Sequence, residues 1–167
     1  MHYKKIIKAG ILTAMLTLLV YFGHRIYALE QTRKAAEKLP SFVFQTVDGK
    51  PFTRDMLQSD YTHIIINHFS PDCEFCQYMT TQIKANRQAL GRSIILMVTE
   101  AGTADVQKFI DRYALRAENN IRVLRDSGLY FYTRFGTMAA PCFFVYDGNR
   151  QLTKRVIGES KVENLIR

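Results

Sequence analysis

Two cysteines separated by two residues, Cys73 and Cys76, are the residues whose type and spacing point most directly to chemistry. Apolar residues near helical spacing follow them, which predicts a helix over 73–90 that begins at Cys73. Two thiols on the first turn of a helix can close a disulfide, and the helix N-terminus favours a thiolate. The spacing therefore predicts a redox dithiol in which Cys73 is the nucleophile and Cys76 resolves the mixed disulfide.

Metal binding is the main alternative for this pair. Structural zinc sites commonly use four ligands, often from two such pairs. Only Cys142 remains as a further cysteine, and His63 and His68 fall inside a predicted strand. A copper- or zinc-binding or delivery module stays open as an alternative, but we predict no cofactor and no metal. Cys142 itself is predicted as a small buried residue, with a third redox thiol as its functional alternative.

Acidic residues flank the predicted nucleophile. Asp72 precedes it, and Glu74 and Phe75 form the dipeptide between the two cysteines. A negative charge beside a thiolate disfavours it, so Glu74 is predicted to modulate the pair. We therefore expect a reductant or a mild exchanger, not a strong oxidant. A helix-capping role is open for Asp72, and His68, on the preceding strand, could direct its ring toward the sulfur.

The elements that must position this dithiol alternate between strands and helices. Residues 61–69 and 93–99 are apolar and β-branched enough to form strands buried on both faces. Asp48-Gly49 and Asp147-Gly148 predict hairpin turns. Further strands are expected at 41–46, 120–124, 142–146 and 151–157, and further helices at 53–58, 103–113, 128–135 and 160–167. This order predicts an α/β fold with a mixed sheet and helices on both of its faces.

Charge and composition separate an N-terminal segment from the rest of the chain. The net formal charge is +8, and residues 1–34 hold six Lys or Arg and one Glu, which is +5 of that total. The remainder is only mildly basic and has no basic stripe with interleaved aromatic residues, so no nucleic-acid partner is predicted. A hydrophobic content of 47% is typical of a globular domain and excludes disorder on compositional grounds.

The N-terminal segment has the pattern of a membrane anchor. Residues 9–23 carry no charge, and Lys8 and Arg25 can extend their charges to the two interfaces. The run is shorter than the roughly 20 residues of a typical span. A cleaved signal peptide is the alternative, but a cut after Ala28 would have Ile26 two places earlier, which is a poor match. We favour an uncleaved signal anchor with a single transmembrane helix.

The predicted organisation is an anchor over residues 1–27, a stalk over 28–39 and a folded domain over 40–167. Pro40 marks the start of the domain because the residue before a proline resists helix. Basic residues are nearly balanced on the two sides of the span, so they do not fix its orientation. A short N-terminal tail rarely crosses a membrane. We therefore expect the domain on the periplasmic or extracellular side of the cytoplasmic membrane.

From about residue 40 onward, the chain resembles the thioredoxin-like proteins of the TlpA/ResA type, which are membrane-tethered, extracytoplasmic thiol–disulfide oxidoreductases. The resemblance implies a thioredoxin-like fold with an N-terminal β-hairpin extension, a cis-proline at Pro141, protein thiol or disulfide substrates and a separate redox donor. It rests on three regions in order: Pro40-Ser41-Phe42 with Asp48-Gly49-Lys50-Pro51-Phe52, Ile66-Asn67-His68-Phe69 before the cysteine pair, and Ala140-Pro141-Cys142-Phe143-Phe144-Val145-Tyr146-Asp147-Gly148.

The chain departs from that family at the site itself. Asp72 stands where the family has Trp, Glu-Phe stands between the cysteines where it has Pro-Pro, and Cys142 follows the proline where it has Thr. Asn67 stands where thioredoxins place a buried acid that helps to deprotonate the second cysteine, and an amide cannot do this proton work. The departures concern the redox potential and the partner more than the fold.

Two other classes share this fold and stay open as alternatives. A peroxiredoxin-like peroxidase would have a proline and then Thr or Ser ahead of its cysteine; Ser70 fits the second position, but Ile66 stands at the first. A copper module of the Sco type spaces its cysteines by three residues and adds a downstream histidine. Here the spacing is two, and no histidine follows His68.

Overall fold

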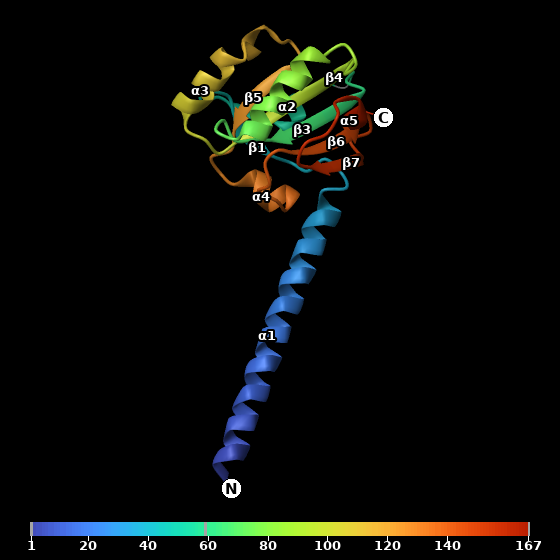
Figure 1. Ribbon diagram of the computed structural model, residues 1–167. Coiled ribbons are helices and arrows are strands. Elements are labelled where there is room, and N and C mark those ends of the chain that lie inside the picture. The colour runs from blue at the N-terminus through green and yellow to red at the C-terminus, as the bar shows by residue number, and fades with distance from the viewer. Residues whose placement is uncertain (1, 59, 167) are drawn as a thin grey trace.

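A mixed sheet covered by helices on both faces forms the domain, and one long helix projects from it (Figure 1). The structure is a computed structural model that describes residues 2–58 and 60–166. The predicted α/β fold class is therefore confirmed. Met1 and Arg167, with which the predicted anchor begins and the predicted domain ends, lie outside the described residues.

The strands lie in the order β2-β1-β5-β4-β3-β6-β7. Central strand β3 runs parallel to β4 and antiparallel to β6, and the β1–β2 hairpin extends the β5 edge. The strands are β1 (Val43–Gln45), β2 (Pro51–Thr53), β3 (His63–His68), β4 (Ser93–Thr99), β5 (Ile121–Arg125), β6 (Cys142–Asp147) and β7 (Leu152–Ile157). The α-helices are α1 (His2–Ala35), α2 (Glu74–Ala85), α3 (Thr103–Arg112), α4 (Tyr130–Phe135) and α5 (Glu163–Ile166), and 3-10 turns occur at Arg54–Met56 and Leu115–Ala117.

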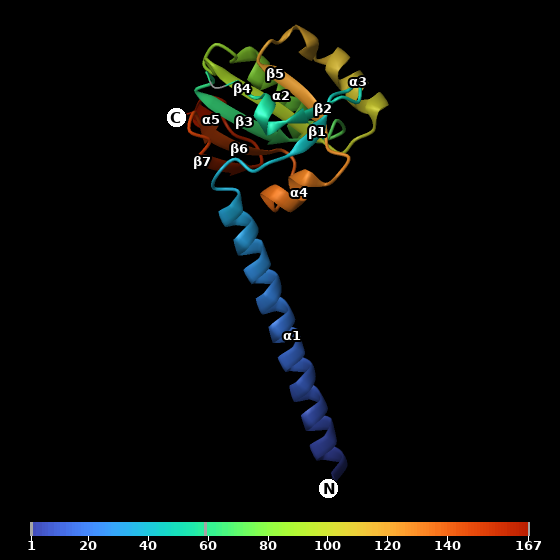
Figure 2. The same ribbon diagram turned by 180° about the vertical axis from the view of Figure 1, so that it is seen from behind.

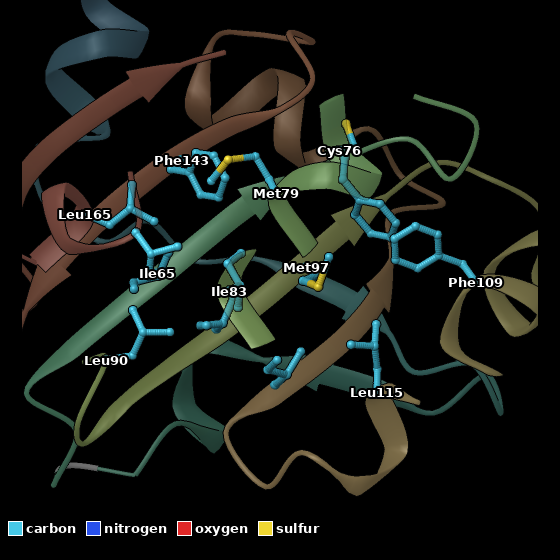
Figure 3. Packing of buried hydrophobic residues seen from close by; sticks show 14 of the residues in the cluster. Ile65, Cys76, Met79, Ile83, Leu90, Met97, Phe109, Leu115, Phe143 and Leu165 are labelled. Carbon is cyan, nitrogen blue, oxygen red and sulfur yellow. The ribbon is translucent and has the colours of Figure 1, made fainter. Parts of the chain in front are cut away.

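Alternation along the central strand divides the core into two layers. Ile65 packs on the face that α2, α3 and α5 cover, which Figure 3 shows from close by. Ile64 and Ile66 pack on the opposite face, which α4 and the segment before β1 cover. All three isoleucines are at most 3% exposed. A strand buried on both faces needs an unbroken apolar run, which explains why this segment was predicted correctly from the sequence.

Several helices are shorter than the sequence predicted. The helix expected over 160–167 begins only at Glu163, and the one expected over 53–58 is a 3-10 turn at Arg54–Met56. Helix α2 ends at Ala85 because Asn86 leaves helical geometry and its side-chain amide donates to the Gln82 carbonyl. Helix α4 begins only at Tyr130. The buried Asp126 carboxylate accepts from the N–H groups of Tyr130 and Phe131 at 3.0 and 2.6 Å, which satisfies the start of this short helix.

Helix α1 is an N-terminal apolar helix that could span a membrane. Within the described residues, its stretch Gly10–Ala35 is long and apolar enough by length and composition, and none of the apolar window in it is buried. The helix continues without a break to Ala35 and leaves the domain beside α4, as the two opposite views show (Figures 1 and 2). The boundaries between anchor, stalk and domain stay predictions.

The residues that follow α1 are built into the domain. Ala36 is 2% exposed, Leu39 is 1% exposed, and the Tyr146 hydroxyl donates to the Ala36 carbonyl at 2.9 Å. The N–H of Leu152, the first residue of β7, donates to the Glu37 carbonyl at 2.7 Å. These contacts make residues 36–39 part of the packed core.

We expect a chain that begins at Ala36 to be more stable than one that begins at Pro40. The longer chain keeps the burial of Leu39, worth about 2 kcal/mol, and the buried hydrogen bond of Tyr146, worth about 1 kcal/mol. Urea unfolding followed by circular dichroism measures the difference in free energy of unfolding. Equal stabilities of the two chains would show that residues 36–39 contribute nothing to the core.

Candidate functional site: a dithiol at the start of α2

Cys73 caps helix α2, and its sulfur lies between two backbone groups. Its backbone is extended, and its Sγ accepts a hydrogen bond from the N–H of Cys76 at 3.2 Å. On the other side, the carbonyl oxygen of Ala140 lies 3.8 Å from the sulfur. Cys73 is partly exposed, so a partner can reach it. The position at a helix N-terminus and the amide donor both favour a negatively charged sulfur.

Cys76 is buried one turn further into the helix. It is 1% exposed and belongs to the same apolar cluster as Met79 and Ile83, with which Figure 3 labels it. Burial raises the pKa of the Cys76 thiol to about 12, and the neighbouring Cys73 adds to this effect. Cys76 is therefore protonated at neutral pH and must lose its proton before it can attack. This suits a residue that acts second.

The segment just before β6, residues 138–141, borders the sulfur of Cys73, and we refer to it as the Pro141 loop. The Ala140–Pro141 peptide bond is cis. Pro141 is buried and Ala140 is exposed. The fold thus brings Cys73, Cys76 and Pro141 to one place, although Pro141 lies far along the chain. Any group that is bonded to the sulfur of Cys73 must pass close to this loop.

The acidic neighbours of Cys73 lie in solvent. Asp72 and Glu74 are both exposed, and neither forms an ion pair with any residue that the structure describes. The capping role left open for Asp72 is filled by Cys73 itself, whose sulfur accepts the capping hydrogen bond. Phe75, 61% exposed, presents an apolar ring next to the dithiol. The modulating role of Glu74 stays a prediction.

Asn67 holds two strands together. Its side chain is 2% exposed, and its amide nitrogen donates to the carbonyl oxygens of Cys142 at 3.1 Å and His68 at 3.2 Å. The bond to Cys142 joins β3 to the start of β6, directly behind the Pro141 loop, and the bond to His68 stays within β3. Asn67 stands where thioredoxins have a proton-accepting acid, and here its side chain makes structural hydrogen bonds instead.

His68 does not direct its ring toward the sulfur. The ring stacks on Phe131 of α4 with 4.5 Å between centroids, on the face of the sheet opposite α2. Its Nδ1 lies 2.8 Å from the Ala139 carbonyl oxygen, and its Nε2 lies 2.8 Å from Glu100 Oε2. Sequence reasoning missed Glu100. The available signal was an acid directly after the buried run 93–99, because parallel strands β3 and β4 end at the same edge of the sheet.

Cys142 packs in the apolar cluster of the opposite face of the sheet, with Phe131 and Phe144, although its thiol is near enough to Cys76 to add to the raised pKa of that residue. It is fully buried, and burial raises the pKa of its thiol to about 12. Over residues 2–58 and 60–166, the structure brings no group of three or more His, Cys, Asp or Glu side chains together that could hold a metal ion.

Comparison with known proteins identifies the fold. No protein-family model matches the sequence, and no curated protein matches it. Among solved structures, a thioredoxin-like protein from Aeropyrum pernix is 16% identical with a TM-score of 0.63, over 89% of this chain and 98% of that one. A secreted Mycobacterium tuberculosis disulfide oxidoreductase is 20% identical with a TM-score of 0.61, over 79% and 94% of the two chains.

StoA from Bacillus subtilis is 18% identical with a TM-score of 0.58, over 75% of this chain and 92% of that one. At these identities the likeness concerns the fold. The predicted thioredoxin-like fold is thus confirmed, and the resemblance to thioredoxin-like thiol–disulfide oxidoreductases holds at the level of structure.

Proposed function

We propose that this protein catalyses thiol–disulfide exchange with protein partners through Cys73 and Cys76. The observation that carries the proposal is the placement of the two thiols. Cys73 is accessible at the N-terminus of α2 and bordered by the Pro141 loop, whereas Cys76 is buried directly beneath it. An accessible sulfur that favours negative charge beside a protonated, buried thiol is the arrangement that two-step exchange requires.

In the reducing direction, the Cys73 thiolate attacks one sulfur of a partner disulfide. The partner's sulfur–sulfur bond breaks, a mixed disulfide forms, and the departing partner thiolate takes up a proton. Cys76 then loses its proton to solvent and attacks the sulfur of Cys73, which releases the second partner thiolate to be protonated. Two electrons pass to the partner, and a Cys73–Cys76 disulfide remains. A separate redox donor must reduce this disulfide before the next cycle.

The same proposal places the domain outside the cytoplasm, as a single-pass protein of the cytoplasmic membrane. Helix α1 could span a membrane, and its N-terminal tail before the apolar stretch is short and contains Lys4, Lys5 and Lys8. A domain on the periplasmic or extracellular side meets proteins in which disulfides form and persist. The contacts of residues 36–39 with the domain would keep the dithiol near the membrane surface.

The test is electron transfer from the full chain, reduced and held in detergent micelles, to insulin. We expect the insulin chains to separate and mass spectrometry to find a Cys73–Cys76 disulfide, with Cys142 still a free thiol. The same chain alkylated at its accessible thiol serves as the control. Intact insulin, or an oxidised pair that includes Cys142, would exclude the proposed reaction.

A further inference from the structure

The ring of His68 faces an oxygen acceptor on each side. Nδ1 lies 2.8 Å from the Ala139 carbonyl oxygen, which can only accept, and Nε2 lies 2.8 Å from a carboxylate oxygen of Glu100. A neutral imidazole has one N–H and could donate to only one of them. Both hydrogen bonds form together when the ring carries both protons.

The surroundings support the charged ring. Burial acts to lower the pKa of His68, but the hydrogen bonds to Glu100 and Ala139 and the charge of Asp126 outweigh it, so the pKa is raised above 6.5. The ring is almost fully buried, with 4% of the side chain exposed. Titratable or charged groups approach this cluster from the ends of β4 and β5 and from β6 and β7: Glu100, Asp126, Cys142 and Arg155.

This ring connects the sheet to the loop beside the nucleophile. Ala139, which faces Nδ1, is the neighbour of Ala140, whose carbonyl oxygen lies 3.8 Å from the sulfur of Cys73. Stacking on Phe131 fixes the plane of the ring. The second carboxylate oxygen of Glu100 is buried and has no hydrogen-bond partner among the described residues, so the carboxylate depends on the ring for its pairing.

We propose that His68, held by Glu100, is a positioning residue that fixes the Pro141 loop against Cys73 while its ring is doubly protonated. The inference rests on the proposed function, because a partner disulfide that reaches Cys73 must lie along this loop. The raised pKa sets the direction of the pH effect. We call the pair of hydrogen bonds from the His68 ring to Glu100 and Ala139 the clamp. The clamp is complete below about pH 6.5 and is lost as the pH rises through the raised pKa of His68.

Three variants separate charge from packing. His68→Phe keeps a ring against Phe131 but donates no hydrogen bond, so the clamp is lost at every pH. Glu100→Gln presents an amide that can donate to Nε2 of a neutral ring, so Nδ1–H still reaches Ala139 and the clamp becomes independent of pH. His63→Gln removes a histidine from the other end of β3 and is the control.

The first measurement is amide hydrogen exchange of the Pro141 loop in the full chain, in detergent micelles, corrected for intrinsic rates. This measurement does not depend on the exchange activity of the protein. We expect protection in the chain with no substitution and in His63→Gln to fall as the pH rises above about 6.5. Protection should stay constant with pH in Glu100→Gln and be low throughout in His68→Phe. Protection in His68→Phe equal to that of the unsubstituted chain would overturn the inference, and so would an unchanged pH dependence in Glu100→Gln.

The second measurement compares two oxidants of the reduced full chain. A peptide disulfide must lie along the loop, whereas 2,2′-dithiodipyridine is small enough to react without it. We expect His68→Phe to slow the peptide reaction on the order of tenfold and to leave the small oxidant nearly unaffected. Equal slowing of both would refute the positioning role. If the unsubstituted chain reacts with neither oxidant while hydrogen exchange behaves as expected, the proposed function fails and the clamp stands.

Discussion

Replacing Cys73 with serine should reduce exchange with a protein disulfide to the rate of the buffer alone, whereas Cys76→Ser should accumulate a covalent complex with the partner. The first substitution removes the only thiol of the three that is accessible. The second leaves the nucleophile in place but removes the thiol that would attack the mixed disulfide. Insulin reduction measures the loss, and non-reducing electrophoresis with mass spectrometry identifies the complex.

Cys142→Ala is the matched control for both substitutions. It removes a fully buried thiol from the opposite face of the sheet, so the exchange rate should stay close to that of the unsubstituted chain. Cys142 also cannot replace Cys73, because its sulfur is inaccessible and burial raises its pKa to about 12. If the Cys73→Ser variant accumulates the covalent complex and Cys76→Ser does not, then Cys76 is the nucleophile and Cys73 is the resolving residue. Exchange that survives both substitutions would eliminate the dithiol mechanism.

The dithiol and its helix could be predicted because their signals are local. Cys73 and Cys76 lie on one helical turn, and the start of that turn depends on neighbouring residues alone. The strand before it was predictable for a similar reason. A run such as Ile64, Ile65 and Ile66 can be satisfied only when both faces are covered.

The surroundings of the dithiol were less accessible to sequence reasoning because they depend on contacts between distant residues. His68 is close to Cys73 in sequence, yet the alternation of β3 turns its ring to the other face, where Glu100 and Ala139 meet it. No residue near His68 in the sequence indicates that Glu100 or Ala139 is its partner. The attachment of residues 36–39 is similar, because the acceptor at Ala36 is paired with the hydroxyl of Tyr146 near the other end of the chain.

The reduction potential of the Cys73–Cys76 couple should lie near thioredoxin's value of roughly −270 mV and well below DsbA's roughly −120 mV. A strongly oxidising couple needs cations or several donors around the nucleophilic sulfur, because these stabilise the reduced state. The sulfur of Cys73 has one amide donor at 3.2 Å and faces a carbonyl oxygen on its other side. His68, the cationic candidate nearest in sequence, is engaged with Glu100 on the opposite face.

Glu74 gives this prediction a matched test. Its exposed carboxylate opposes charge on the neighbouring sulfur, so it destabilises the reduced state and lowers the potential. Glu74→Gln should therefore make the potential less negative, by roughly 10 mV, because exposed charges interact weakly. Glu30→Gln removes an equal charge from α1, outside the domain, and should leave the potential unchanged.

Equilibration of the full chain with dithiothreitol, with thiol alkylation as the readout, measures all three values. A potential of the unsubstituted chain near that of DsbA would mean that the reduced state is stabilised by a group that the contacts of Cys73 do not include. A more negative potential in Glu74→Gln would reverse the sign of the effect assigned to this acid.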